Sequence, residues 1–590
     1  MSESTILPPL TKLLSRLWQY IPARRRQQLL LLLLLMLASS LLEVVSIGAV
    51  LPFLAAITSP EKLMSIPSVV LLMRWINIST AGQLQAMLTV AFIIAALSAG
   101  LVRVLLIWCN TRLAYAIGEM LSHEIYWKTL CQPYAIHLGR NSSVVISTII
   151  NKVSIVIASV INPVLTLISS LFLMLAIFII LLSIDVKVTL FAIVGFGLIY
   201  AGIIKSTRNF YKRNGKTVAM QSTQVIKVVQ EGLGGIRDIL LDGSQSTHCK
   251  IFQQANEPLR RAQGGMQFLA QSPRYMIEAF GMVLVALAAL TLTMRPEGIT
   301  SAMPVLGALA VGAQRILPLM QTSYMSWSSL IGSKATFIEV LEFLDQNISV
   351  DINKEDITNI SFSKTIQLRD IIFSYSKETK KILNNVSLVI EKGSRVGIVG
   401  STGSGKSTLI DLIMGLLKPD SGVIEIDGAA LEESNLRSWQ EHIAHVPQNI
   451  FLSDNTIAEN IAFGVSRDFI DMDRVRLVAT QANIASEIEK WPLKYATKVG
   501  ERGIRLSGGQ LQRIGIARAL YKNTDVIIFD EATSALDSQT EAQVMAALES
   551  LTSDLTIIII AHRLSTLRQC SSVFEITEAG NICIRSAANI

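Results

Sequence analysis

The chain has 590 residues, of which 51% are hydrophobic and only 16% are charged. Soluble domains carry about 25% charged residues, so the composition excludes a wholly soluble protein and indicates that a large part of the chain lies in lipid. The net charge of +7 does not indicate nucleic-acid binding, because the basic residues stand beside apolar runs, as membrane topology requires.

Six apolar runs are long enough to cross a membrane, which takes about 20 residues of helix. Arg24, Arg25 and Arg26 precede the first run, so the positive-inside rule places the N-terminus in the cytoplasm. An even number of spans then returns the chain to the cytoplasmic side. The predicted spans are Leu29–Ile57, Met87–Trp108, Ile157–Leu182, Val188–Ile204, Tyr275–Met294 and Pro304–Met325.

The two long inner connections, 109–156 and 205–274, are compatible with helix and are predicted to extend the membrane helices into the cytosol. From Thr336 to Asn359 the chain becomes polar and acidic, which predicts a linker. Beyond it, β-branched runs alternate with helical stretches, as in an α/β domain. We therefore expect a helical membrane domain over residues 1–335, a linker over 336–360 and an α/β domain over 361–590.

A glycine-rich loop follows the predicted strand 395–399 and matches the pattern G-x-x-x-x-G-K-[ST]. Its glycines let backbone N–H groups converge on phosphate oxygens, and the start of the next helix adds a favourable dipole. We expect Lys406 to contact the β- and γ-phosphates of a nucleoside triphosphate and Ser407 to ligate Mg²⁺. The loop consists of Gly400, Ser401, Thr402, Gly403, Ser404, Gly405, Lys406 and Ser407.

A second site feature is the acidic pair that ends the apolar strand 526–529. An unpaired carboxylate at Asp530 would be costly there, and a magnesium ion supplies the compensating charge. Glu531 stands where a base could orient water towards the γ-phosphate. Taken alone, adjacent acids also fit the cap of a following helix.

Leu506–Gln510 reads Leu-Ser-Gly-Gly-Gln and lies between the loop and the acidic pair. With the three motifs in this order, residues 366 to 590 resemble the nucleotide-binding domain of an ABC transporter. The resemblance implies ATP as the nucleotide and Mg²⁺ as its cofactor, with Glu531 as the catalytic carboxylate. It further implies catalytic contacts by Gln448 and His562, Mg²⁺ contacts by Ser407, Gln448 and Asp530, and nucleotide contacts by Tyr375 and Thr408.

Ser507, Gly508, Gly509 and Gln510 form a second phosphate cradle at a helix start, which a single chain would not need for one γ-phosphate. The resemblance implies that ATP lies between Lys406 of one copy and Ser507 of another. The chain therefore resembles an exporter-type half-transporter, with a six-helix transmembrane domain followed by an α/β P-loop domain. A homodimer is the simplest assembly, and a heterodimer with a related chain is the alternative.

Glu43, Arg103 and Arg315 fall within predicted spans, where ionisable residues are expensive. In one interpretation Glu43 or Glu278 neutralises an arginine and fixes helix packing. In the other, Arg103 and Arg315 face a central cavity and attract an anionic head group such as a diphosphate.

The stretches Pro133–Ser143 and Gln230–Asp238 are similar to flippases of lipid-linked oligosaccharides from bacterial protein glycosylation (the PglK type) and to related polysaccharide exporters. We therefore expect an ATP-hydrolysing flippase of the cytoplasmic membrane that moves an amphipathic, lipid-linked oligosaccharide. Export of lipid A, peptides or hydrophobic drugs is the alternative within the class. From a different class, a nucleotide-gated channel or regulator is the alternative, against which the intact Glu531 and His562 argue.

Overall fold

The computed structural model describes residues 8–58, 61, 64, 80–184, 186–293, 298–346, 358–376, 380–531, 543, 554–560, 567 and 570–585. The chain forms two compact units. The helical unit comprises Met1–Cys131 and Arg140–Ile348, and the sheet unit comprises Gln132–Gly139 and Ser349–Ile590. The segment 132–139, which includes helix α7 (Tyr134–Gly139), thus groups with the sheet unit.

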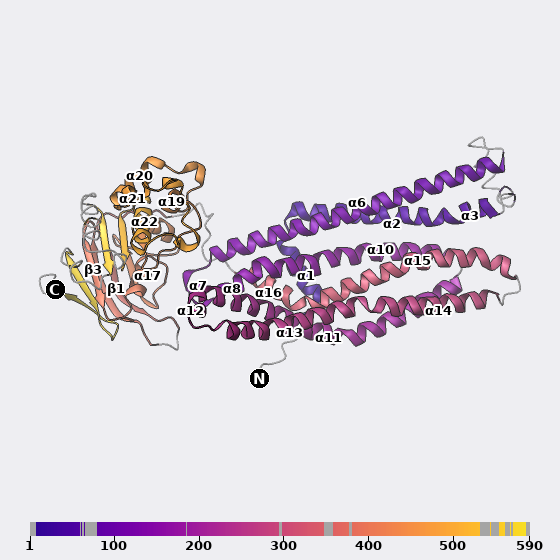
Figure 1. The fold of residues 1–590 in the computed structure, drawn as a ribbon, viewed down its shortest axis with the longest axis horizontal. Coiled ribbons are helices and arrows are strands. Elements are labelled where there is room, and N and C mark those ends of the chain that lie inside the picture. The colour runs from indigo at the N-terminus through magenta and orange to yellow at the C-terminus, as the bar shows by residue number, and fades with distance from the viewer. Residues whose placement is uncertain are drawn as a thin grey trace. The chain divides into compact units, whose positions relative to one another are not determined.

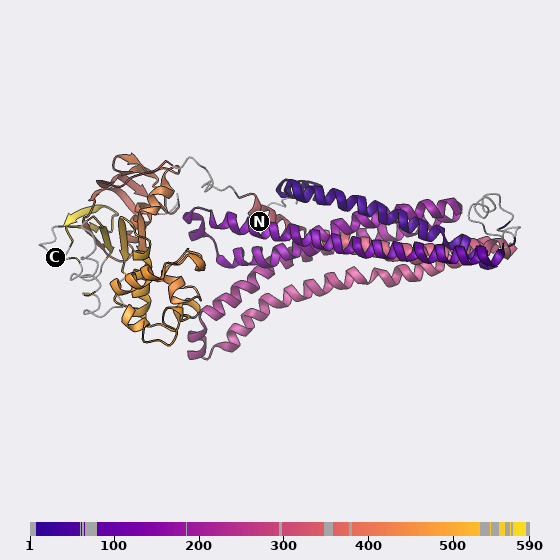
Figure 2. The same ribbon diagram turned by 90° about the horizontal axis from the view of Figure 1, so that it is seen from above.

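Long helices run side by side through the helical unit, as Figures 1 and 2 show. At the start of α6, Thr80 and Gln83 form a reciprocal capping box. The helices are α1 (Leu10–Tyr20), α2 (Ala23–Gly48), α3 (Val50–Thr58), α6 (Ala81–Leu130), α8 (Ser142–Ile146), α9 (Val153–Val156), α10 (Asn162–Ile184), α11 (Val186–Gly234), α12 (Ile236–Leu241), α13 (Gln245–Gln271), α14 (Pro273–Thr293), α15 (Gly298–Gly332) and α16 (Lys334–Leu344).

Three helical stretches of the described residues are long and apolar enough to cross a membrane: Ala23–Gly48, Ala81–Leu130 and Ser142–Ser183. They contain most of the first three predicted spans. Helix breaks at Ala49, so the first of those spans divides between α2 and α3. The other three predicted spans lie on α11, α14 and α15.

Two π-helical turns interrupt the stretch between α8 and α10, at Ser147–Lys152 and Ile157–Ile161. The second turn packs close to α6 at Gly118, where a Cβ atom would come within 1.9 Å of Ile157 Cδ1. The glycine therefore permits an approach of the two helices that a larger residue would prevent.

The expectation that the linker begins at residue 336 is wrong for its first nine residues, because they belong to α16. This helix buries Phe337, Val340, Leu341 and Leu344, each with no exposed area, in the core of the helical unit. The apolar positions recur at a spacing of three and four residues, which is the period of one helix face. Two of the acidic residues that suggested a linker, Glu339 and Glu342, lie on the less buried face of this helix. Glu339 pairs with the buried Lys152 at 2.5 Å.

The sheet unit contains two sheets. The antiparallel sheet has the order β2-β1-β4-β5, and the other has the order β10-β9-β3-β8-β7-β6, with parallel pairing from β9 to β6. The strands are β1 (Thr365–Phe373), β2 (Leu383–Glu391), β3 (Arg395–Gly400), β4 (Ser421–Ile426), β5 (Ala429–Ala430), β6 (Ile443–Val446), β7 (Val526–Asp530), β8 (Thr556–Ile560), β9 (Ser572–Ile576) and β10 (Ile582–Arg585).

Two hydrophobic cores hold the sheet unit together. One joins both sheets around helix α17 (Lys406–Ile413) and includes the fully buried Trp439, whose Nε1–H donates to the Ile413 carbonyl at 2.8 Å. The other joins strands β6, β7 and β8 to four helices that Figure 1 shows in orange: α19 (Ile457–Ile461), α20 (Met472–Gln481), α21 (Ala485–Ile488) and α22 (Gly508–Tyr521). Trp439 lies on helix α18 (Leu436–Glu441), which belongs to the first core.

Candidate nucleotide site

Strand order places the predicted site residues at one edge of the parallel sheet. Ile398 of β3 and Asp530 of β7 both pair with Ile560 of the intervening strand β8. Strand β6 pairs with β7 on the other side, through Val446 and Phe529. The glycine-rich loop, the acidic pair and Gln448 therefore all follow the carboxyl ends of neighbouring parallel strands, which is where open α/β sheets bind ligands.

The glycine-rich loop has a backbone that only glycine adopts easily. Gly403 and Gly405 have φ values of +82° and +104°, and Gly400 has a φ of +154°. A Cβ atom at Gly400 would lie 2.6 Å from both the Ile576 carbonyl oxygen and Ser404 Oγ. The loop is therefore tightly curled, as a cradle built from main-chain N–H groups requires.

Lys406 is the first residue of α17, and its side chain curls back over the loop. Its Nζ donates to the carbonyl oxygens of Gly400 at 2.8 Å and Ser401 at 3.0 Å. The hydroxyl of Ser404 is buried without a hydrogen-bond partner among the described residues. A cation held over the loop and a buried polar atom without a partner both fit the binding of phosphate oxygens.

Tyr375 lies beside the first turn of α17. Its hydroxyl is 3.0 Å from Thr408 Oγ1, and its ring meets that of Phe373 edge-on. The side chain is 53% exposed. The structure thus brings together the two residues that the resemblance assigns to the nucleotide beyond the loop, and it leaves a ring surface open for stacking.

Burial and mutual repulsion act together on the carboxyl groups of the site. Burial raises the pKa of Asp530, and the neighbouring Glu531 raises it further, while Lys406 opposes them. Burial together with Asp530 raises the pKa of Asp411, on α17, to about 6. Since carboxyl groups crowded in this way favour a bound cation, the residues fit Mg²⁺.

The described residues do not form a complete set of protein ligands for a metal ion. The described residues contain no group of three or more His, Cys, Asp or Glu side chains able to hold a metal ion. Mg²⁺ is held by one or two carboxylates together with substrate phosphates and water. Asp530 and Ser407 would supply protein ligands of this kind, with Gln448 close by.

Gln448 and Glu531 are in direct contact, because Gln448 Nε2 donates to Glu531 Oε2 at 2.7 Å. Glu531 has a φ of +50°, and its N–H donates to the Ile560 carbonyl at 3.1 Å. This left-handed backbone differs from the extended angles typical of a helix N-cap. His562 lies outside the described residues, two positions after the end of β8.

Ser507 is the N-cap of α22. Its side chain accepts from Gln510 N–H, and the Gln510 side chain accepts from Ser507 N–H. Ser507 and Gly508 are exposed, whereas Gly509 and Gln510 are partly covered. Helix α22, which begins at this cradle, packs into the second hydrophobic core, whereas α17 packs into the core that joins the two sheets.

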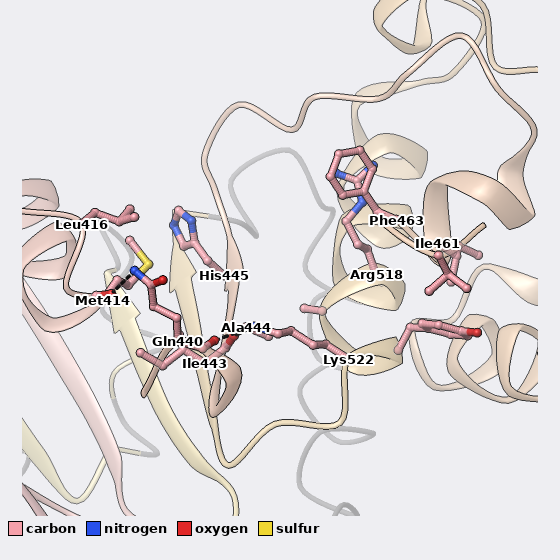
Figure 3. Close-up of a pocket in the computed structure, with 13 residues that line it drawn as sticks. Met414, Leu416, Gln440, Ile443, Ala444, His445, Ile461, Phe463, Arg518 and Lys522 are labelled. Carbon is pink, nitrogen blue, oxygen red and sulfur yellow. Dashed lines mark hydrogen bonds between the residues drawn. The ribbon is translucent and has the colours of Figure 1, made fainter. Parts of the chain in front are cut away.

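A cavity of about 560 Å³ lies elsewhere in the sheet unit, between β6 and the C-terminal half of α22 (Figure 3). Arg518 and Lys522 line it, but both donate to main-chain carbonyls. Burial lowers the pKa of His445, also in the lining, to about 4. The lining includes no residue predicted to bind nucleotide, so the cavity is separate from the site.

In the helical unit, Glu43 on α2 pairs with Arg315 on α15 at 2.9 Å. Glu278 pairs with Arg274, one turn away on α14, and the described residues show no pair between Glu278 and an arginine of another span. Arg103, on α6, is partly buried and has no ion pair or hydrogen bond among the described residues. The structure therefore brings two of the three predicted substrate residues together and leaves the third apart from them.

The chain matches two family models: the ABC transporter model over residues 383–534 and the ABC transporter transmembrane region model over residues 29–298. The two matches together span well over half of the chain. The chain belongs to the ABC transporter family. The order of the two matches makes it an exporter-type half-transporter, with a helical transmembrane domain before an ATP-binding domain.

Curated relatives are ATP-dependent lipid A-core flippases. Those of Saccharophagus degradans and Aromatoleum aromaticum are 45% and 32% identical over 37% and 65% of this chain, and the aligned parts span 37% and 63% of the relatives' own lengths. The flippase of Pseudomonas savastanoi pv. phaseolicola is 29% identical over 90% of this chain and 86% of its own length.

A solved structure of a bacterial Atm1-family ABC exporter with ATP bound has a TM-score of 0.77 to this chain. The match covers 96% of this chain and 95% of that one, at 22% identity. It confirms the predicted exporter fold.

Proposed function

We propose that this ABC half-transporter is an ATPase that works as a homodimer in the cytoplasmic membrane and flips an amphipathic lipid. Its N-terminus and ATP-binding domain face the cytoplasm. The observation that carries the ATPase part is the convergence of the glycine-rich loop, Asp530, Glu531 and Gln448 at neighbouring strand ends.

Each residue has a role that follows from its position. The loop N–H groups and Lys406 bind the phosphates, and Tyr375 supports the base. Mg²⁺, held through Ser407 and Asp530, neutralises phosphate charge when it is bound. Glu531 orients the attacking water, and Gln448 holds the Glu531 carboxylate in place at 2.7 Å. His562 is proposed, from the family resemblance, to contact the γ-phosphate.

Two copies would complete the site, because α17 and α22, the helices that begin at the two cradles, pack into different cores of one domain. Ser507 and the N–H groups of Gly508, Gly509 and Gln510 close over the γ-phosphate bound by the partner's loop. Binding of ATP then draws the two ATP-binding domains together, and hydrolysis releases them. This closure supplies the work that reorients the transmembrane helices.

For the substrate, the relatives favour a lipid A-core type of glycolipid over the lipid-linked oligosaccharide of our sequence-based prediction. Both are phosphate-bearing amphipathic lipids with saccharide head groups, and an arginine binds phosphate through a planar pair of donors. Arg103, which has no ionic partner among the described residues, is the arginine we propose for that contact. Arg315, already paired with Glu43, is assigned mainly to packing.

The test is ATP hydrolysis and lipid translocation by purified protein in proteoliposomes. We expect hydrolysis by the wild type and its loss in Glu531→Gln; equal rates would refute the ATPase assignment and leave the channel or regulator interpretation. Vesicles carrying fluorescent lipid A-core or an oligosaccharide diphosphate lipid separate the two substrates. Arg103→Ala should slow flipping with basal hydrolysis retained.

A further inference from the structure

The first turn of α22 carries a hydrogen-bonded network that none of the sequence motifs predicts. Gln510 Oε1 accepts from Ser507 N–H at 2.9 Å, and Gln510 Nε2 donates to Glu487 Oε2 at 2.9 Å. The other carboxylate oxygen of Glu487 pairs with Arg513 Nη2 at 2.6 Å. Glu487 lies on α21, so the network ties a neighbouring helix to the start of α22.

This network fixes which way the Gln510 amide points. A main-chain N–H can only donate and a carboxylate can only accept, so a single amide orientation satisfies both Ser507 and Glu487. Ser507 Oγ accepts from Gln510 N–H at 3.3 Å. The network does not use the hydroxyl hydrogen of Ser507, so this exposed side chain can still donate to a phosphate oxygen.

The network also offsets the negative charge that Glu487 brings next to the cradle. A lone carboxylate near a helix N-terminus competes with an incoming phosphate for the same positive potential. Arg513 offsets the charge of Glu487, and its Nη1 donates to the Asn483 carbonyl at 2.8 Å. The Arg513 side chain is only 11% exposed. Its position is therefore fixed from two sides.

We propose that Glu487 is a positioning residue for the second phosphate cradle: through Gln510 and Arg513 it holds Ser507 as a hydroxyl donor to the γ-phosphate of the partner copy. The proposal rests on the proposed function, because the cradle acts only when two copies close on ATP. Glu487 itself does not touch nucleotide. Its effect is therefore on closure, and the first binding of nucleotide to Lys406 is independent of it.

The experiment measures two affinities of the full chain in nanodiscs. Closure is followed in the Glu531→Gln background by energy transfer between labels at the two C-termini, as ATP is added. Binding to the loop alone is measured with MgADP, which lacks the γ-phosphate. Loss of a charge-assisted hydrogen bond is expected to raise the ATP concentration for half-closure of Glu487→Ala about tenfold, with the MgADP affinity unchanged.

Glu489→Ala is the matched control, because Glu489 is an exposed acid two positions along the same segment and has no side-chain hydrogen bond or ion pair among the described residues. It should behave as the parent protein. Unchanged closure in Glu487→Ala, or an equal loss of MgADP and ATP affinity, overturns the proposal. An equal loss would mean general damage to the domain.

Glu487→Gln keeps the size of the side chain and leaves the cradle residues unchanged. Its amide offers one acceptor oxygen, whereas the carboxylate accepts from Gln510 through one oxygen and pairs with Arg513 through the other. We expect this variant also to need more ATP for half-closure than the parent protein, and unchanged closure overturns the proposal even if Glu487→Ala fails to fold.

Ser507→Glu distinguishes failure of the proposed function from failure of the positioning role. Normal ATP-dependent closure in Ser507→Glu would refute the proposal that ATP is bound between two copies. Impaired closure in Ser507→Glu, together with normal closure in Glu487→Ala, would refute only the positioning role of Glu487.

Discussion

The ion pair between Glu43 and Arg315 allows a packing role to be separated from a substrate role. The two side chains meet at 2.9 Å but differ in exposure: the Glu43 side chain is 7% exposed and that of Arg315 is 45% exposed. Removing Arg315 therefore leaves a buried carboxylate without its partner. Removing Glu43 leaves a guanidinium that keeps access to its surroundings.

The expected costs follow from this asymmetry. Breaking a buried ion pair by deleting one partner costs about 3–5 kcal/mol, and we expect Arg315→Met to lose about 3 kcal/mol of unfolding free energy. Glu43→Gln should lose about 1 kcal/mol, because the neutral amide oxygen can still accept a hydrogen bond from Arg315. The double variant should be more stable than Arg315→Met alone, since no charge is then left unpaired.

Thermal unfolding in nanodiscs measures these differences, and lipid flipping in proteoliposomes measures the functional effect. Arg274→Met is the matched control, because the Arg274–Glu278 pair is exposed on both sides at 53% and 43% and is worth at most about 1 kcal/mol. Two results together would refute the packing role and assign Arg315 to the substrate. Arg315→Met would be as stable as the wild type, and the double variant would flip lipid no faster than Arg315→Met.

Three further variants test other parts of the structure. Glu531→Gln should lose ATP hydrolysis and retain ATP-dependent closure; loss of both would mean that Glu531 serves the fold. Gly118→Ala should lower the free energy of unfolding by about 1–3 kcal/mol, and with it the melting temperature, because the added Cβ would lie 1.9 Å from Ile157 Cδ1. Gly100→Ala should leave the melting temperature unchanged, because no atom lies within 4 Å of the added Cβ. The pKa of His445 is lowered to about 4, so between pH 6.5 and 4 the unfolded chain binds a proton there that the folded chain excludes. Acidification from pH 6.5 to 4 should therefore lower the free energy of unfolding by up to about 3 kcal/mol through this histidine. When unfolding is measured against pH, His445→Gln should lose less stability over the same range than the wild type.

The phosphate-binding loop was predictable because its chemistry is local. Glycines, a following helix and a lysine at fixed spacing are enough to define a cradle of main-chain donors, and the structure adds only the angles at Gly403 and Gly405. The contact between Gln448 and Glu531 was not predictable in this way. It depends on β6 lying next to β7, although β7 comes about eighty residues later in the chain.

Composition alone did not predict helix α16, whose two faces differ in polarity. Acidic residues between 336 and 359 suggested a linker, but Phe337, Val340, Leu341 and Leu344 repeat at the helical period and are buried. The network at Glu487 lay beyond sequence reasoning for another reason. Its members come from separate helices, and no spacing rule connects an acid on α21 with the glutamine of a motif on α22.

The left-handed backbone of Glu531 favours one of the two interpretations that the sequence left open. A φ of +50° costs a non-glycine residue of order 1 kcal/mol, and a residue that only capped a helix would have no reason to adopt it. Two contacts hold the strained residue, its N–H on the Ile560 carbonyl and its carboxylate on Gln448 Nε2. Because both partners follow or end strands that flank β7, the strain places the carboxylate over the strand ends, where the glycine-rich loop would hold the γ-phosphate.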